Sequence, residues 1–570
     1  MRETVPDRIR AATFDHIIVG GGTAGCIVSA RLSEQPQRKI LLIEAGKDYP
    51  PGSEPRSVAD AYPRSYGDPS FFWPDLVAEV RRESAPGGQI VERRFEQARI
   101  MGGGSSIHGM VALRGLPADY DEWPTLGAEG WGWQDVLPYF KRLETDLDFG
   151  GPLHGDSGPI PIRRQLPPQW APFTRAVAQT WRTEGFSDFA DANADFRDGI
   201  SSTPMSNSVA GRVSSATGYL TREVRRRPNL MLLDQAYVRR ILFEGTRATG
   251  VEVTRGGETV MLRAREVILS AGGIHSPAIL LRSGVGPADA LRASGVDVVA
   301  DLPPVGANLQ NHPLIYVATH LKSRSVQPAS VHAWGQAWLR YSSGHADCPA
   351  GDMAMFAVNK SAWHPLGRRI GAISVSPYKS FSSGSVRLRA ADPFAAPEVR
   401  FGLLSDERDL DRMASGLGDC FRTFASPIVS ATRNEVFLPD PLLVKRLNWP
   451  KPSSWAISAA INMALNLVPT LRSSMLGRMA LDVEKLAGDT MALRELALAR
   501  AGPAGHVIGT CRLGAPDAPD AVVDPACRVR RITGVRVVDG SIIPAMVCAN
   551  TNLPITMVAE RAADRIKETG

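Results

Sequence analysis

Three glycines near the N-terminus have the spacing of a loop that binds nucleotide phosphates. Gly20, Gly22 and Gly25 form G-x-G-x-x-G directly after the apolar run Ile17-Ile18-Val19. The first glycine permits a tight turn, the second lets a pyrophosphate approach the backbone, and the third lets helix and strand pack closely. Glu44 ends a second apolar run and can accept hydrogen bonds from a ribose. The pattern predicts dinucleotide binding, against the alternative of a glycine-rich turn in an ordinary α/β domain.

A histidine near the C-terminus has the surroundings of a residue that a ligand approaches. His506 stands among small residues in the run Gly505-His506-Val507-Ile508-Gly509-Thr510. An imidazole with a pKa near working pH can act as a general base. Asn552, in Asn550-Thr551-Asn552-Leu553-Pro554, follows 46 positions later. On the residues alone, a hydrogen-bonded core histidine and a turn or cap asparagine are the competing interpretations.

A second glycine-rich segment lies between Arg99 and Arg114, with the sequence RIMGGGSSIHGMVALR. Three consecutive glycines followed by two serines expose backbone N–H groups and allow a ligand to approach closely. Upstream, residues 49–90 are rich in Pro, Ser and Gly and are expected to form loops. Within them, Phe71-Phe72-Trp73 is either loop packing or a wall beside a cofactor.

The elements that must position these residues can be read from the apolar pattern. Ala24 to Leu32 reads as a helix between two buried parallel strands, the second from Ile40 to Ile43. Further strands are expected at 230–233, 238–243, 251–253 and 267–269. Ile373-Ser374-Val375 and Ser385 to Arg389 alternate polar and apolar residues, which indicates a separate antiparallel sheet.

Length and composition narrow the class of protein. A chain of 570 residues exceeds one ordinary core, and 44% apolar with 22% charged residues is typical of a globular protein. The net charge of +6 is spread along the chain, which does not favour nucleic-acid binding. We expect no transmembrane helix and no signal peptide. Six scattered cysteines without a CxxC pair predict free thiols, no metal site and a cytoplasmic location.

Long ordered segments resemble the glucose–methanol–choline (GMC) family of flavin-dependent oxidoreductases over nearly the whole chain. They are IIVGGGTAGCIVSARLSE with LLIEAG, RIMGGGSSIHGMVALRG, DYDEWPTLGAEGWGWQDVLPYFKRLE, VILSAGGIHSPAILLRSGVGPADALRASGV, PVGANLQNHP, HVIGTCRLG, VVDGSIIP and ANTNLPITMVAERAAD. Within the family, FFWP, LHGDSGPIPI and ANTNLP are most similar to bacterial oxidases of 5-hydroxymethylfurfural and aromatic alcohols. The resemblance implies FAD as cofactor and an α/β fold. The implied fold has two domains. One is a Rossmann-like FAD-binding domain with a parallel sheet, helices and a β-meander, and the other is a substrate domain with an antiparallel sheet covered by helices.

The resemblance also assigns roles to individual residues. It maps His506 onto the family's catalytic histidine and Asn552 onto its histidine-or-asparagine partner, which holds the alcohol oxygen. Asp539 resembles an acidic residue near the ribityl and pyrophosphate groups. The expected FAD contacts are Gly20, Gly22, Thr23, Ala24, Gly25, Glu44, Ala45, Trp73, Met101, Gly103, Ser106, His108, Gly109, Met110, Val111, Val238, Ala271, Asp539, Gly540, Asn552 and Pro554.

His108 departs from the family pattern, because most relatives carry Asn at this position. Some relatives attach flavin covalently through a histidine one position earlier, where this chain has Ile107. We therefore expect non-covalent FAD, with His108 as a contact residue.

The resemblance implies oxidation of a primary alcohol, aryl or furanic, to the aldehyde and onward through the aldehyde hydrate, with hydride transfer to flavin N5. The expected acceptor is O2, which gives H2O2; the alternatives are a dehydrogenase that uses a quinone and a non-redox cyanohydrin lyase. The substrate and acceptor are small molecules, and the sequence does not indicate an oligomeric state.

The predicted domain order is discontinuous. Residues 1–311 form the first part of the FAD-binding domain, 312–495 the substrate domain, and 496–570 the return to the first domain. Trp455 to Leu467 is apolar but too short to span a bilayer. We expect a core helix or a pocket lid there, with an interfacial membrane contact as the alternative.

Overall fold

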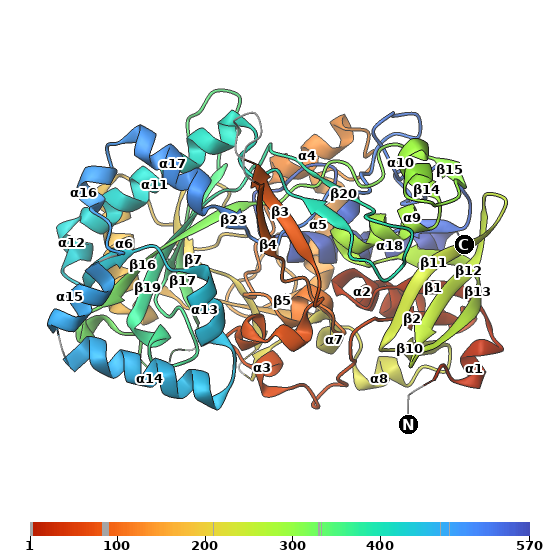
Figure 1. The fold of residues 1–570 in the computed structure, drawn as a ribbon, viewed down its shortest axis with the longest axis horizontal. Helices are drawn as coiled ribbons and strands as arrows, with labels where there is room; N and C mark the ends of the chain where they lie inside the picture. The colour runs from red at the N-terminus through yellow and green to blue at the C-terminus, as the bar shows by residue number, and fades with distance from the viewer. Residues whose placement is uncertain are drawn as a thin grey trace.

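The computed structural model describes residues 4–82, 90–208, 210–328, 331, 333–467, 469–477 and 479–569. In the described residues, two seven-stranded sheets lie in opposite halves of the molecule, with smaller sheets and loops between them (Figure 1). The α/β fold predicted from the sequence, one sheet mostly parallel and the other antiparallel, is confirmed.

The first sheet carries the glycine motif. Its spatial order is β10-β2-β1-β13-β12-β11, with a seventh strand, β24, also paired to β13. The strands β10, β2, β1, β13 and β24 run parallel, whereas β11, β12 and the first half of β13 form an antiparallel meander. The bounds are β1 Thr13–Val19, β2 Ile40–Ile43, β10 Leu230–Leu233, β11 Ala236–Glu244, β12 Arg247–Arg255, β13 Glu258–Leu269 and β24 Val535–Val537.

The parallel strands are uniformly buried, as expected for a sheet covered on both faces. All four residues of β2 and the last four of β1 are buried. Helices α2 (Thr23–Leu32) and α18 (Asn552–Thr569) pack together on one face, beside α5 (Trp133–Leu143) (Figure 1). Because α2 begins directly after β1, its N-terminus lies at the carboxyl edge of the sheet.

The second sheet is antiparallel throughout. Its order is β22-β16-β19-β18-β17-β7, with β23 also paired to β16. Strand β7 comes from an earlier part of the chain than the predicted substrate domain, 312–495, whose limits remain a prediction. The bounds are β7 Gly199–Ser202, β16 Pro313–Leu321, β17 Gly335–Tyr341, β18 Met353–Val358, β19 Ile370–Pro377, β22 Arg433–Phe437 and β23 Gly502–Pro503.

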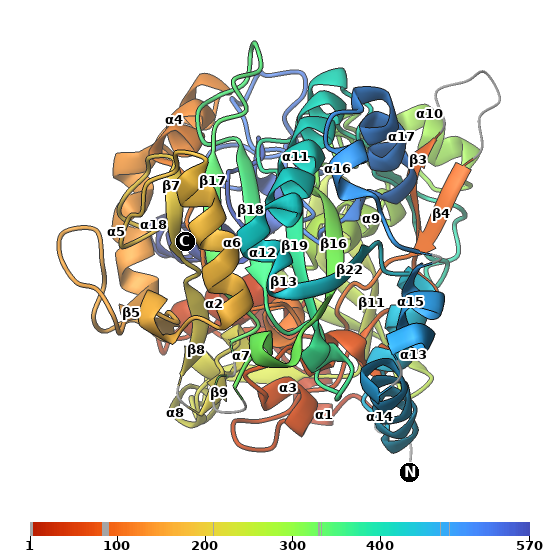
Figure 2. The ribbon, with the colours of Figure 1, turned by 90° about the vertical axis from the view of Figure 1, so that its left-hand side faces the viewer.

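Helices cover the outer face of the second sheet. Figure 2 shows α6, α11 and α12 in front of its strands. A hydrophobic cluster joins α6 and α11 to the inward residues of the sheet. The bounds are α6 Pro172–Thr183, α11 Glu407–Ala425, α12 Pro427–Ser430, α16 Val483–Leu486 and α17 Thr490–Arg500.

The segment predicted as loop, residues 49–90, is only partly irregular. It contains β3 (Val77–Arg82), which pairs with β4 (Ile90–Arg94) and β21 (Glu398–Arg400). The sequence VAEVRR alternates as a strand should, with Ala78 and Val80 buried. The loop prediction was wrong there because composition was given more weight than alternation.

Helix α9 (Gly272–Arg282) follows β13 and places the second signature segment against the first sheet. The remaining helices are α1 Asp7–Arg10, α3 Arg56–Ala59, α4 Pro117–Thr125, α7 Ser215–Gly218, α8 Arg222–Arg225, α10 Ala288–Ala293, α13 Pro441–Asn448, α14 Pro452–Leu467 and α15 Pro469–Gly477. The other strands are β5 Glu144–Asp146, β6 Ile160–Arg163, β8 Met205–Ser208, β9 Gly211–Arg212, β14 Val285–Gly286, β15 Ala300–Asp301 and β20 Ser385–Arg387.

Within the described residues, no single helix is long and apolar enough to cross a membrane. Helices α14 and α15 together reach the length and composition of a span, but their axes are bent by 114°.

Candidate active site

One cavity of about 1260 Å3 connects the glycine motif with the predicted base. Gly22 and Glu44 line one part of it, and His506 and Asn550 line another. Aromatic side chains from both halves of the molecule form much of the remaining wall, including Trp73, Trp334, Phe356 and Tyr378.

The glycine loop has the geometry that a pyrophosphate requires. Gly20 has a φ of +101°, and a Cβ there would lie 2.6 Å from the carbonyl oxygen of Ser270. A Cβ on Gly25 would lie 1.9 Å from the carbonyl oxygen of Gly20, so this glycine lets helix α2 pack on the loop. No described side chain caps the N-terminus of α2, whose N–H groups remain available to an anion.

Glu44 is a buried carboxylate at the end of β2. Its Oε2 accepts a hydrogen bond from the Gly21 N–H at 2.8 Å, and its Oε1 accepts one from the Gly46 N–H at 2.7 Å. These bonds fix the carboxylate at the cavity wall while each oxygen keeps a lone pair for a ribose hydroxyl. Burial raises the pKa of Glu44 to about 7.

Most predicted cofactor contacts line the cavity, but four do not. The residues lining it are Gly20, Gly22, Thr23, Ala24, Glu44, Ala45, Trp73, Gly103, His108, Gly109, Met110, Val111, Val238, Ala271, Asp539, Gly540 and Asn552. Gly25 lies behind these residues, where it lets helix α2 pack on the glycine loop. Met101, Ser106 and Pro554 are buried behind the wall, and the Ser106 hydroxyl donates to the Met101 carbonyl at 2.8 Å. For these three, contact with FAD stays a prediction.

His108 presents one ring nitrogen that the described protein leaves unpaired. Its Nδ1 accepts hydrogen bonds from the Met110 N–H at 2.9 Å and from Arg212 Nη1 at 3.1 Å. The proton is therefore assigned to Nε2, a buried donor without a hydrogen-bond partner in the described chain. Burial and the Arg212 guanidinium lower the pKa of His108 to about 4. A neutral N–H donor thus lies in the cavity wall.

His506 is held by the segment that precedes β16. Its backbone N–H donates to Asn311 Oδ1 at 2.9 Å. Ile508 and Gln310 exchange backbone hydrogen bonds, and the Ala504 N–H donates to the His312 carbonyl. Gly505, with a φ of +85°, allows the turn that brings the histidine to the cavity.

The hydrogen bonds around His506 assign its tautomer. His312 Nε2 faces the Tyr378 carbonyl oxygen at 2.8 Å and must donate to it, so His312 Nδ1 is an acceptor. His506 Nδ1 lies 2.8 Å from that acceptor and carries the proton. His506 Nε2 is therefore unprotonated, which is the state that a general base requires.

Asn550, and not Asn552, is the partner of His506. Asn550 Oδ1 accepts from the Tyr378 hydroxyl at 3.0 Å, which directs its Nδ2 to donate to His506 Nε2 at 3.1 Å. Asn552 instead donates to Thr23 Oγ1 at 3.0 Å, where the N-termini of α2 and α18 meet. The predicted pairing of His506 with Asn552 is corrected accordingly.

Sequence reasoning missed three members of this hydrogen-bonded set: His312, Tyr378 and Asn550. His312 stood in the quoted motif PVGANLQNHP, so its presence in a signature segment was an available signal. Tyr378 directly follows β19 in SVSPYKS, where nothing in the pattern indicates a site.

His506 is kept neutral by its surroundings. Burial lowers its pKa well below the ordinary value, and the neighbouring His312 and His108 rings act in the same direction. His312 itself has its pKa lowered to about 4, chiefly by burial. A base that is already unprotonated at neutral pH can accept a proton without first losing one.

Asp539 fixes the backbone beside the cavity. Its Oδ2 accepts from the Gly272 N–H at 2.8 Å and from the Ser276 hydroxyl at 2.5 Å. Its Oδ1 accepts from the Ser541 N–H at 2.8 Å and from the Ser541 hydroxyl. Burial raises the pKa of Asp539, while these hydrogen bonds favour its ionised form. Asp539 thus joins the N-terminus of α9 to the turn at Gly540.

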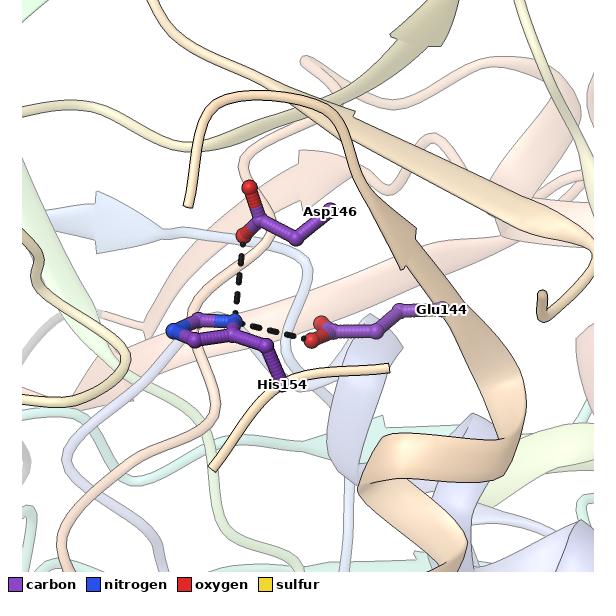
Figure 3. A group of neighbouring side chains, drawn as sticks. All are labelled: Glu144, Asp146 and His154. Atoms are coloured by element: carbon purple, nitrogen blue, oxygen red, sulfur yellow. Dashed lines mark hydrogen bonds and ion pairs between the residues drawn. The ribbon is translucent and has the colours of Figure 1, made fainter. Parts of the chain in front are cut away.

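A second buried histidine lies away from the cavity, in an ionic cluster (Figure 3). His154 Nδ1 is 3.0 Å from Glu144 Oε1 and 3.2 Å from Asp146 Oδ2, and its Nε2 is 2.6 Å from Asp191 Oδ2. Glu144, Asp146 and His154 are close enough for a metal site. Two buried guanidiniums already pair with the carboxylates, Arg114 with Glu144 and Arg164 with Asp146 and Asp191. Three carboxylates then face two guanidiniums and an imidazolium, which balances the charge within the cluster.

Comparison with known proteins identifies related chains. The N-terminal model of the GMC oxidoreductases matches residues 14–314, and the C-terminal model matches residues 380–559. The 5-(hydroxymethyl)furfural oxidase of Methylovorus sp. (strain MP688) is 41% identical over 569 residues, covering 97% of this chain and 98% of that protein. An oxygen-dependent choline dehydrogenase of Sinorhizobium medicae (strain WSM419) is 32% identical over 576 residues, covering 97% of this chain and 95% of that protein.

Solved structures show the same fold. Pyridoxine 4-oxidase from Mesorbium loti superposes with a TM-score of 0.79 at 25% identity, covering 98% of this chain and 100% of that one. A fungal aryl-alcohol oxidase has a TM-score of 0.74 at 22% identity, with 98% and 99% covered. The two family models and the full-length relatives establish that this chain belongs to the GMC oxidoreductases, a family of flavoproteins.

Proposed function

We propose that the protein oxidises a primary alcohol to the aldehyde with FAD as its redox cofactor. One observation carries this proposal: the unprotonated Nε2 of His506 faces the same cavity that the glycine loop lines. A proton acceptor and a dinucleotide cradle in one cavity are what alcohol oxidation requires.

The described residues fit FAD. One cavity extends from the glycine loop to His506, the N-terminus of α2 has no side-chain cap, and the Glu44 carboxylate is placed to bind a ribose. The unpaired Nε2–H of His108 supplies a donor for an acceptor on the cofactor ring. FAD, when bound, would take the two electrons of the alcohol as a hydride and pass them to an external acceptor.

The side chains around His506 would divide the work on the substrate. His506 Nε2 removes the hydroxyl proton, and its Nδ1–H remains bonded to His312, which keeps the ring in one orientation. Asn550 Nδ2 donates to His506 Nε2 at 3.1 Å. The alcohol hydroxyl would displace this bond, donate to Nε2 and accept from the amide, which would hold the alcohol oxygen beside the base. Asn552 would act on the cofactor side, through its bond to Thr23.

The cavity wall favours planar substrates. Trp334, Phe356 and Tyr378 line it, and the Trp334 indole is fixed by donation to the Gly109 carbonyl at 2.8 Å. Rigid aromatic walls suit aryl and furanic alcohols, which stack offset or edge-on against them. The identity to a 5-(hydroxymethyl)furfural oxidase supports the same substrate class and further oxidation of the aldehyde as its hydrate.

Anaerobic flavin bleaching tests the proposal. The purified yellow protein is mixed without oxygen with 5-hydroxymethylfurfural, benzyl alcohol, choline or hexanol. Bleaching by the first two, with slower or no bleaching by choline and hexanol, is the expected result. A yellow protein that none of these alcohols bleaches would contradict the proposal and favour a non-redox role.

The acceptor is tested in the same cuvette. We propose O2 as the acceptor, so admitting air should restore the yellow colour rapidly and release H2O2. Colour that returns only after addition of a quinone would identify a dehydrogenase that does not use oxygen.

Non-covalent attachment is tested separately. The position where some relatives attach flavin holds Ile107, a buried side chain that cannot form such a bond. Acid precipitation should therefore release the flavin into the supernatant. Flavin that stays with the pellet would point to His108 as the attachment site, to be checked by peptide mapping.

A further inference from the structure

Helix α14 exposes several large apolar side chains while two of its serines are buried. Ser454 and Ser458 are buried, whereas Trp455, Met463 and Leu467 are 51%, 60% and 72% exposed. A helix on the surface of a water-soluble domain normally has the opposite arrangement. The exposed face of α14 is therefore suited to an apolar environment rather than to water.

Neighbouring helices extend this exposed apolar surface. Leu442 and Leu443 of α13 are 77% and 47% exposed, and Met475 of α15 is 45% exposed. Figure 2 shows α13, α14 and α15 together along one side of the molecule. We call this surface the α13–α15 face, defined by Leu442, Leu443, Trp455, Met463, Leu467 and Met475. Exposed apolar side chains gathered on neighbouring helices usually mark an interaction site.

The charge of this segment has one sign. The sequence from Pro441 to Leu481 contains no Asp or Glu but has five basic residues: Lys445, Arg446, Lys451, Arg472 and Arg478. Arg446 and Lys451 are exposed, and Lys451 Nζ lies over the Trp449 ring at the junction of α13 and α14. Exposed tryptophan and lysine around an apolar helical surface are typical of proteins that lie at a membrane interface.

We propose that the α13–α15 face binds the surface of an anionic phospholipid bilayer. The apolar side chains would enter the boundary between headgroups and acyl chains, and the exposed Arg446 and Lys451 would contact lipid phosphates. Lys445 and Arg472 instead pair with Glu96 and Glu435. The 114° bend between α14 and α15 suits helices lying in the interface better than a straight span. A second copy of this chain fits less well, because a two-fold contact would bring the basic residues of both copies together without carboxylates from this segment.

Binding at this face would place the cavity beside the bilayer. Leu443, Leu447 and Ile461 line the cavity as well as belonging to α13 and α14. A molecule dissolved in the membrane could then reach the cavity along apolar side chains. The membrane contact itself does not depend on the proposed redox function.

Vesicle flotation of the full-length holoprotein tests the proposal. The protein should float with vesicles of phosphatidylcholine and phosphatidylglycerol at about 3:1, and several-fold less with pure phosphatidylcholine. The double variant Met463→Ser/Leu467→Ser should partition about tenfold less or lower, since it removes two exposed apolar side chains. Lys451→Glu should weaken binding only to the anionic vesicles, and about 0.5 M salt should do the same.

Met261→Ser is the matched control. Met261 is 65% exposed on β13, in the half of the molecule away from the α13–α15 face (Figure 1). This variant should float as the unmodified protein does, and all variants should keep its melting temperature and bound flavin. Absence of flotation with anionic vesicles, or equal loss in Met261→Ser, would overturn the proposal. A concentration-dependent dimer that the double variant abolishes would also overturn it, and would assign the face to a second copy.

Discussion

His506 is half-buried at the cavity wall and His154 is buried, and their neighbours give them opposite protonation states. His506 contacts an amide and a second neutral imidazole, so nothing compensates a positive charge and its pKa falls well below the ordinary value. His154 contacts three carboxylates, whose hydrogen bonds outweigh burial and raise its pKa to about 10. The comparison teaches that the partners of a buried histidine, and not its burial, decide whether it can act as a base.

The two environments also differ in what they leave open. Every hydrogen-bonding position of the His154 ring is directed at a carboxylate, and two guanidiniums close the cluster. The His506 ring has one nitrogen fixed by His312 and the other turned toward the cavity. The cluster around His154 joins parts of the chain near β5 and β6, whereas the surroundings of His506 leave room for a substrate.

Replacing His506 should give the largest effect on catalysis. His506→Ala removes the only proton acceptor in the proposed mechanism, so anaerobic flavin reduction should slow by about 10² to 10⁴-fold. The variant should still fold and retain FAD, because the cofactor contacts lie on other segments. Stopped-flow absorbance of the flavin measures the rate. A variant that reduces its flavin within a few-fold of the unmodified rate would break the comparison, since His506 would then be structural as well.

Replacing His154 should affect stability and leave the chemistry unchanged. His154→Ala removes an imidazolium from among three buried carboxylates, which should cost about 3–5 kcal/mol of unfolding free energy. Urea denaturation measures the loss. The control is His345→Ala, a partly exposed histidine 3.6 Å from Asp411, which should cost about 1 kcal/mol or less. Equal losses in the two variants would show that the ionic cluster contributes nothing specific.

The two asparagines give a smaller and more discriminating effect. Asn550→Ala removes the amide beside His506 and should slow flavin reduction by about 10 to 10²-fold, with little change in FAD affinity. Asn552→Ala removes the bond to Thr23 and should weaken FAD retention more than it slows reduction. Stopped-flow rates and FAD titration of the apoprotein separate the two. The reverse pattern would restore Asn552 as the partner of His506.

The local parts of the site were predictable from sequence, and the long-range pairings were not. The glycine loop, β2 and Glu44 form within one βαβ unit, so the spacing of Gly20, Gly22 and Gly25 already fixes their geometry. The choice between Asn550 and Asn552 depends on where α18 begins. Pro554 in its first turn was a signal that Asn552 starts the helix and therefore faces α2.

Surface exposure was the other feature that sequence could not supply. The expectation for residues 455–467 was a core helix or pocket lid, with membrane contact as the alternative. The run is apolar enough for any of these, and only the structure shows Trp455 and Leu467 exposed while Ser458 is buried. Ile461 and Leu465 line the cavity, so part of the helix does form a wall of the pocket.

The smallest expected effects are on pH dependence: His154 should change how stability varies with pH, and His506 should set how the rate of flavin reduction varies with pH. His154 has a folded pKa of about 10, above its ordinary value of about 6.5, so its stabilising contribution is complete below pH 6.5 and is lost as the pH rises toward 10. The difference in melting temperature between the unmodified protein and His154→Ala should therefore shrink over that interval.

His506 has a lowered pKa and stays neutral, so flavin reduction should not change between about pH 6.5 and 8 and should fall only in acid. Melting curves and stopped-flow reduction across this range measure both. A constant melting difference would mean that His154 is neutral, and a reduction rate rising through pH 7 would mean that His506 is protonated in the resting enzyme; either result would remove the contrast between the two sites.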